Sequence, residues 1–339
     1  MTIKKLLCIL SLTFVSISFA QTKYSTTSDN FNNYHATVSA AERMFRNDSL
    51  LQAYAKFDIA FENYKGAINP SHYFKAALCA IKIKEEFKAL HYLEKAITNG
   101  YEIDSNKLAL VVFNNQNTKQ EYQANIGTWN ANRDAARNTT FEGELYAYAP
   151  TPNKVADAKY NEALTYCTMC IKTKTCSKTA TDYVSKNKIL KERMKADSLI
   201  AAKLLANINQ YGFPNLKLVD KKACEIARTI LLNYDVDKTN ERLDGVLFKA
   251  LNDGYISPSF YAQVIDRRNV KAVLAPEFYE PITGYEKTIA ASMAGANNKR
   301  KTIGLYNIIL PAKTAQKPAT TAKGGSTITK PTDGNLYDY

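Results

Sequence analysis

The sequence predicts an all-α protein of antiparallel helical hairpins, with a second helical module and a disordered C-terminal tail. Three observations lead to this prediction. Glycine (13) and proline (10) are scarce for 339 residues, which disfavours the many turns of an all-β chain. Apolar residues recur every three to four positions over much of the chain, as on one face of a helix. The 22 tyrosines suit half-buried surfaces, since each joins an apolar ring to a polar hydroxyl.

The first 20 residues have the pattern of a cleavable signal peptide. Lys4 and Lys5 precede an uncharged stretch from Leu6 to Phe19, and Ala20 ends a small-residue cleavage pattern. The uncharged stretch has 14 residues, whereas a helix that spans a membrane needs roughly 20. We therefore expect cleavage after Ala20, export to the periplasm or the medium, and no transmembrane span in the mature chain.

The region 35–113 contains a pattern that repeats after 36 residues. Four positions of the first copy align with four of the second: Ala53, Phe57, Ala60 and Tyr64 with Ala89, Leu93, Ala96 and Gly100. The small residues among them let neighbouring helices approach closely. Each copy is therefore predicted to be a helical hairpin, and the four helices are expected at about 36–46, 49–64, 71–84 and 86–99.

This region resembles the tetratricopeptide repeat superfamily, whose unit is close to 34 residues. The likeness lies in the spacing of small and large residues on paired helices, and the Trp-Leu-Gly-Tyr signature of the family's first helix is missing. The alternative is a plain array of helical hairpins. Stacked hairpins of this kind form a concave surface, which the resemblance implies would hold a peptide or a partner protein.

A helix-ending motif occurs twice. The segment 95–101 reads KAITNGY, and the segment 249–255 reads KALNDGY. In each copy we expect the glycine to take a positive φ just after the helix and the tyrosine to pack back on the last turn. The residues of this motif are Gly100, Tyr101, Gly254 and Tyr255. A further helix is expected after each copy, at about 106–113 and 258–266.

The region 155–285 is predicted to be a C-terminal helical domain. Apolar stripes indicate further helices at about 155–171, 180–210, 218–234 and 239–252. By contrast, three segments show little helical pattern. We expect a flexible leader at 21–34, a linker or loop at 114–154, and a weakly ordered basic tail at 286–339.

Part of the C-terminal domain, about 197–282, resembles a domain family of unknown function found in exported bacterial proteins. The family's Gly-aromatic-Pro step and its Asp-Arg pair are matched by Gly212, Pro214, Asp266 and Arg267. A histidine typical of the family is missing from 232–235, and 279–282 departs from its final Tyr-Gly-Thr-Gln run. The resemblance implies no established activity.

Three cysteines lie close together, and we expect a structural disulfide among them. They are Cys167, Cys170 and Cys176, and an exported protein meets an oxidising environment. Two alternatives remain open, a zinc site with Cys224 as a fourth ligand and a redox-active Cys-x-x-Cys pair. Cys79 and Cys224 lie on apolar helix faces and are expected to be buried small residues.

The sequence carries no catalytic signature, and we predict no cofactor and no metal centre. The three histidines, His35, His72 and His91, all lie in the first third of the chain, so a Ser-His-Asp unit cannot form within the second half. Asp266, beside Arg267, is expected to make an ion pair or a helix-end contact rather than to act as an acid.

The net charge of +13 is concentrated in two stretches, 172–203 and 299–330. Such fields attract polyanions. For an exported protein these would be anionic envelope polymers or lipid headgroups rather than nucleic acid. The plainer interpretation is a solvated helix face followed by a disordered tail.

Three functions are compatible with these features. We favour an exported, non-catalytic scaffold that binds an envelope protein or peptide through its helical repeats. The second is a carboxylate-based hydrolase of envelope glycan or peptide, with its site in the C-terminal domain. The third is a binder of polyanions or membrane surfaces that uses the basic stretches.

Overall fold

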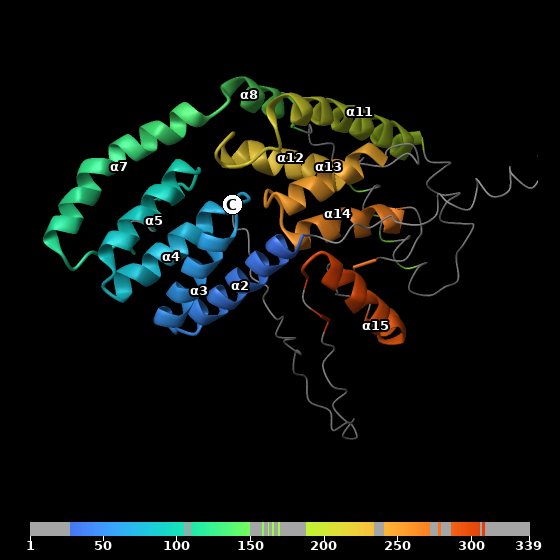
Figure 1. The fold of residues 1–339 in the computed structure, drawn as a ribbon. Coiled ribbons are helices and arrows are strands. Elements are labelled where there is room, and N and C mark those ends of the chain that lie inside the picture. The colour runs from blue at the N-terminus through green and yellow to red at the C-terminus, as the bar shows by residue number, and fades with distance from the viewer. Residues whose placement is uncertain are drawn as a thin grey trace, which may run out of the picture.

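The computed structural model describes residues 28–104, 107, 110–149, 158, 162, 165, 169, 188–233, 241–271, 277–278, 286–305 and 307–308. These residues form 11 helices and no strand, so the predicted all-α class is confirmed. The helices follow one another in a curved array, shown in Figure 1.

Four helices at the start of the array form two hairpins. They are α2 (Asp29–Arg46), α3 (Leu50–Asn63), α4 (Pro70–Lys82) and α5 (Glu86–Thr98). The stripe predicted on the second helix of the first hairpin is its buried face, where Ala53 and Phe57 are fully buried. Each hairpin turns through a residue with positive φ, Asp48 in the first and Lys84 in the second, 36 positions apart. Membership in the tetratricopeptide repeat family stays a prediction.

The expectation of a flexible leader is wrong from residue 29 onward. Ser28 caps α2, since its hydroxyl accepts a hydrogen bond from Phe31 N at 3.2 Å. Phe31, Tyr34 and Val38 then recur along one buried face of the helix. The polar residues between them conceal this stripe, but three large apolar groups are sufficient to hold the first turns against the core.

The expectation of a linker at 114–154 is also wrong. The segment forms α7 (Gln116–Ala136) and α8 (Thr139–Ala147). α7 is rich in Asn and Gln and buries only Thr118, Tyr122 and Trp129. Its start is held from outside, because the buried carboxylate of Glu86 accepts hydrogen bonds from the backbone N–H groups of Asn114 (2.7 Å) and Asn115 (3.0 Å).

The second half contains the four helices that the apolar stripes predict, within a few residues. They are α11 (Lys188–Tyr211), α12 (Lys221–Asn233), α13 (Glu241–Asn252) and α14 (Pro258–Lys271). Of the helix expected at 155–171, residues 158, 162, 165 and 169 are helical and the rest lies outside the described residues. The helix expected at 106–113 is wrong at its end, since 111–113 has no regular structure.

The predicted weakly ordered tail begins with a helix, α15 (Glu286–Thr302). This part of the prediction is wrong because contacts with other segments hold α15, and the composition of the helix does not predict such contacts. The guanidinium of Arg300 is buried and donates to the carbonyl oxygen of Phe278 at 2.7 Å. Ile303, just beyond the helix, is also buried. Residues 311–339 lie outside the described residues.

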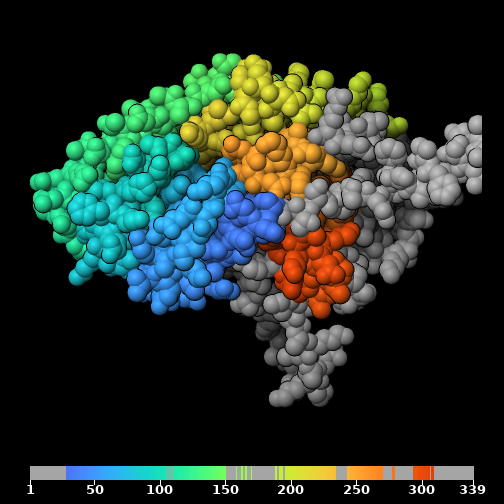
Figure 2. Space-filling model, in the orientation of Figure 1, coloured from blue at the N-terminus to red at the C-terminus, as the bar shows by residue number. Residues whose placement is uncertain are grey.

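The array curves until its beginning meets its end. Gly304, two residues beyond the end of α15, lies beside Phe31 and Asn32 of α2 and Pro258 of α14. Figure 2 shows α2 in contact with this later part of the chain on one face of the molecule. One buried apolar cluster includes Phe57, Phe141 and Phe260, so the two helical regions share a core. Within the described part, no helix has the length and apolar character of a membrane span.

Candidate functional site

The two copies of the helix-ending motif close α5 and α13 with the same backbone geometry. Gly100 has φ +104° and Gly254 has φ +84°. In each copy the N–H of the tyrosine reaches back to a carbonyl five residues earlier, Tyr101 to Ala96 and Tyr255 to Ala250, both at 2.9 Å. This is the Schellman pattern. Both helices therefore stop at a defined point, and both points face the same space in the molecule.

The Gly-aromatic-Pro step lies at that space as well. α11 ends at Tyr211, and Gly212 takes φ +92° while its N–H donates to Ile208 O at 2.9 Å. The chain then turns so that the ring of Phe213 stacks on Tyr255, with the ring centroids 6.3 Å apart. Two motifs that are about 40 positions apart in the sequence thus form one wall.

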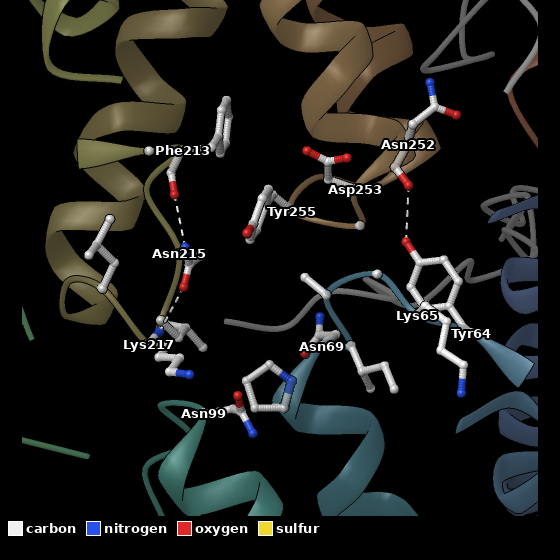
Figure 3. Close-up of a pocket in the computed structure, with 18 of the residues that line it drawn as sticks. Tyr64, Lys65, Asn69, Asn99, Phe213, Asn215, Lys217, Asn252, Asp253 and Tyr255 are labelled. Carbon is white, nitrogen blue, oxygen red and sulfur yellow. Dashed lines mark hydrogen bonds between the residues drawn. The ribbon is translucent and has the colours of Figure 1, made fainter. Parts of the chain in front are cut away.

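The space is a cavity of about 800 Å³ between the first hairpins and the second half of the chain (Figure 3). α3, α5, α7, α11 and α13 end at it, and α2 and α4 begin at it. Its lining is rich in asparagine and in aromatic rings, with Asp253 as the one acidic side chain among the described lining residues. The asparagines are Asn30, Asn69, Asn99, Asn215 and Asn252, and the rings are Tyr64, Tyr211, Phe213 and Tyr255.

Backbone contacts join the two halves on one side of the cavity. Ala67 N donates to Asp253 O at 2.7 Å, and the hydroxyl of Tyr64 donates to Asn252 O at 3.1 Å. Burial is the main cause of the raised pKa of Tyr64, so its hydroxyl stays protonated as a donor. A methyl group at Gly254 would collide with Ala67 O. This close approach is possible only for glycine.

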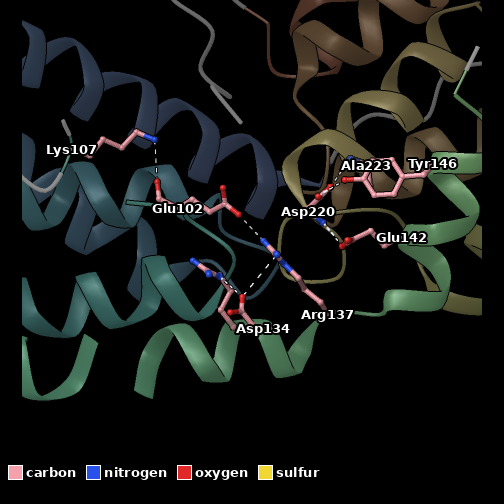
Figure 4. A network of polar contacts seen from close by, with 9 residues as sticks. Glu102, Lys107, Asp134, Arg137, Glu142, Tyr146, Asp220 and Ala223 are labelled. Carbon is pink, nitrogen blue, oxygen red and sulfur yellow. Dashed lines mark hydrogen bonds and ion pairs between the residues drawn. The ribbon is translucent and has the colours of Figure 1, made fainter. Parts of the chain in front are cut away.

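A polar network fixes the opposite side, where the loop between α11 and α12 forms the wall (Figure 4). Arg137 pairs with Glu102 at 2.7 Å, and the carboxylate of Glu142 accepts from Asp220 N at 3.0 Å. The carboxylate of Asp220 in turn accepts from Ala223 N at 2.7 Å, at the start of α12, and from the hydroxyl of Tyr146. This last hydrogen bond raises the pKa of Tyr146 to about 12. The segment 114–154, predicted to be a linker, thus supplies three residues of this network, Arg137, Glu142 and Tyr146.

Asn69 is the cavity residue with an unsatisfied group. It is 5% exposed and caps α4, since its Oδ1 accepts from Ser71 N at 2.9 Å. Its amide nitrogen, Nδ2, has no hydrogen-bond partner in the described structure. Figure 3 shows this nitrogen directed into the cavity. Sequence reasoning missed Asn69, although an Asn-Pro pair before an apolar helical stripe is a recognisable start signal.

A buried polar cluster lies behind this wall. The hydroxyl of Tyr34 and Nδ1 of His72 are 2.9 Å apart, and Glu42 pairs with Lys75 at 2.6 Å and lies 3.7 Å from His72 Nε2. His72 is 1% exposed and Glu42 2%. With so little exposure, these groups join α2 to α4 rather than meet a substrate.

His35 and the described cysteines are also parts of the packing, whereas His91 is exposed on α5. Burial lowers the pKa of His35 to about 4 and raises that of the thiols Cys79 and Cys224 to about 12. A thiol with such a high pKa is a poor nucleophile and metal ligand. No group of three or more metal-ligating side chains occurs in the described part of the chain. Cys167, Cys170 and Cys176 lie outside it.

Asp266 and Arg267 stabilise the fold away from the cavity. The carboxylate oxygen Oδ1 of Asp266 accepts from Glu277 N (2.6 Å) and Phe278 N (2.9 Å), and Asp266 is 3% exposed. Arg267 donates to the side chain of Asn233 on α12 at 3.1 Å. Of the four positions that carry the second resemblance, Gly212 is the one that lines the cavity.

Neither the protein-family models nor the curated proteins nor the solved structures compared with this chain match it.

Proposed function

We propose that this chain is an exported, non-catalytic interaction protein that binds a peptide segment of an envelope partner in the central cavity. One observation carries the proposal. Helix ends from both halves of the array surround about 800 Å³ of space, and half of the lining residues are Asn, Tyr or Gly.

The composition of the lining favours a binding surface. Tyrosine offers a large rigid contact at a low cost in side-chain entropy, and asparagine and glycine supply adaptable hydrogen bonds. The same combination is typical of surfaces that recognise other proteins. Since the lining residues come from segments near 64–70, 211–218 and 252–255, a bound segment would touch both halves at once.

The chemistry of the cavity weighs against the hydrolase alternative. General acid–base hydrolysis by carboxylates requires two acidic groups that flank the scissile bond, and the described lining contains one, Asp253. Asp266 is committed to two backbone N–H groups.

The other parts of the proposal rest on the sequence. Export depends on the signal-peptide pattern of residues 1–20, and the concave binding surface depends on the resemblance to tetratricopeptide repeats. Binding of anionic polymers or lipid surfaces by 172–203 and 299–330 stays a prediction. Within the second stretch, Arg300 is engaged with Phe278 and Lys299 lies 3.8 Å from Glu277.

Site-specific photo-crosslinking in the exporting cells tests the proposal. A photoreactive phenylalanine analogue replaces Lys217, which is exposed and lines the cavity. The matched control replaces Lys56, which is exposed on α3 and is not a lining residue. We expect a discrete crosslinked product from position 217 and none from position 56. Equal products from both positions, or none from position 217, would contradict binding in the cavity.

The same cells test export. N-terminal sequencing of the purified chain should begin at Gln21, the residue after the predicted cleavage point. An intact Met1 on the purified protein would contradict export through a cleaved leader.

A further inference from the structure

The wall at the start of α4 offers a donor that the protein does not satisfy. Asn69 uses Oδ1 to cap the helix, and Nδ2 is left without an acceptor although the residue is 5% exposed. Buried polar groups nearly always have a partner, and one without a partner destabilises the fold. The nitrogen is directed into the cavity (Figure 3). A ligand group that accepts a hydrogen bond, such as a carbonyl oxygen, would satisfy it.

The facing wall offers acceptors. In Figure 3, Asp253 lies across the cavity from Asn69, at the end of α13. Its carboxylate is paired with Lys249 through Oδ2, and Oδ1 accepts no hydrogen bond in the described part of the chain. α11 also ends on this side of the cavity, and the carbonyl ends of helices carry partial negative charge. A ligand in the cavity therefore needs N–H groups toward Asp253 and a carbonyl toward Asn69.

Charge restricts the ligand further. An anion would meet Asp253 and the negative ends of five helices. A cation would meet Lys65, Lys217 and the positive starts of α2 and α4. An uncharged ligand with both donors and acceptors meets neither difficulty. A peptide main chain is such a ligand, because every trans amide presents its C=O and N–H on opposite sides.

We propose that the cavity binds an extended peptide by its main chain, with Asn69 Nδ2 donating to a peptide carbonyl and Asp253 accepting from a peptide N–H. The rings of Phe213 and Tyr255 flank the peptide side chains. This inference rests on the proposed function and names its ligand chemistry. Because the contacts are to the main chain, the site accepts many sequences.

The substitution Asn69→Asp isolates the donor. Aspartate is as good a helix cap as asparagine, so α4 keeps its hydrogen bond from Ser71, while the group that faces the cavity changes from a donor to an acceptor. Asn138→Asp is the control. Asn138 caps α8 in the same way, through Phe141 N at 2.9 Å, and is not a lining residue.

The probe is a capped tetrapeptide, acetyl-Ala-Gly-Ser-Ala-amide, which has no charged end. It is added to the full chain, expressed with its own leader and labelled with ¹⁵N, at up to about 5 mM, several times a Kd of 1 mM. We expect the side-chain amide resonances of Asn69, identified by their absence in Asn69→Asp, to shift on binding. We also expect Asn69→Asp to weaken binding about tenfold, since one hydrogen bond is lost and two acceptors then face each other. Asn138→Asp should bind as the natural chain does.

A second ligand tests the other wall. The same tetrapeptide with every main-chain nitrogen methylated and its C-terminus made a dimethylamide keeps its carbonyls but has no N–H to donate, and we expect it to bind at least about tenfold more weakly. N,N′,N″-Triacetylchitotriose, an uncharged glycan, should leave the Asn69 resonances unchanged. Each of three results would overturn the inference: no shift with the capped peptide, equal affinity of Asn69→Asp and the natural chain, or stronger binding of the glycan. If crosslinking from position 217 persists in that case, the proposed function stands and only the ligand chemistry is wrong.

Discussion

Helix ends of two kinds occur in this protein, and they share a backbone conformation but differ in what surrounds them. Asp48 and Lys84 turn the two hairpins with φ values of +58° and +68°, and both side chains are exposed. Gly100 and Gly254 also have positive φ, but a methyl group at either would collide with the backbone of the other half, Leu216 and Ala67 respectively.

The difference shows which helix ends are determined by neighbours in the sequence and which are determined by tertiary packing. A turn inside a hairpin connects neighbours in the sequence, so its residue only has to tolerate left-handed φ, at a cost of about 1–2 kcal/mol for most residues. The ends of α5 and α13, by contrast, each bring together backbones that are more than 100 positions apart. There the absence of a side chain is required by packing.

The largest effect is expected from Gly254→Ala. Positive φ costs about 1–2 kcal/mol and overpacking against Ala67 adds about 1–3 kcal/mol, so the free energy of unfolding should fall by about 2–5 kcal/mol. Urea denaturation measures this loss. The matched control is Gly245→Ala on the same helix, where an added methyl group meets nothing within 4 Å. It should stabilise the protein by up to about 1 kcal/mol, and a similar effect of both substitutions would contradict the packing requirement.

Lowering the pH should destabilise the folded protein through His35, a buried residue of the hairpin region. The pKa of His35 is lowered by burial to about 4, from 6.5. Between these values the unfolded chain takes up a proton that the folded chain does not, so stability falls as the pH drops below about 6.5. The loss at pH 5 is about 2 kcal/mol relative to pH 7.5. His35→Gln should remove this part of the pH dependence. An unchanged pH dependence in the variant would mean that another group causes it.

Gly212→Ala separates backbone strain from collision. Gly212 has φ +92°, but a methyl group there would meet nothing within 4 Å. The expected loss is about 1–2 kcal/mol, from the left-handed conformation alone. Urea denaturation of this variant beside Gly254→Ala makes the comparison direct. If Gly212→Ala costs as much as Gly254→Ala, the contact with Ala67 contributes nothing.

The smallest effect is expected in the hairpin turns. Lys84→Gly relieves left-handed strain but gives the unfolded chain more freedom, so the net gain should be about 0.5 kcal/mol. Asp48→Gly should change stability less, because aspartate adopts this conformation more readily than lysine. Thermal unfolding of the two variants side by side can resolve such a difference. A loss of stability in Lys84→Gly would indicate that its side chain makes a contact that matters.

How closely a helix can be predicted from the sequence depends on how regularly apolar residues recur along it. α3 and α5 have dense apolar stripes, and their bounds were predicted to within about one residue at most ends. α7 has one buried aromatic in every two turns, Tyr122 and Trp129, among asparagines and glutamines. Its pattern is too thin to identify a helix without α5 and Glu86 beside it. α15 was missed for the same reason, since Arg300 and Ile303 hold it by contacts with distant segments.

By itself the sequence determined the helical class, the hairpins of the first third and the glycine ends of α5 and α13, because these depend on residues within a few positions of one another. Only the tertiary structure decided that these ends meet around a cavity. The hydrogen bond from Tyr64 to Asn252 spans 188 positions, and the unsatisfied amide of Asn69 is apparent only once its neighbours are in place. Helical periodicity acts over three to four residues, so it specifies which faces are apolar but not which distant faces will meet.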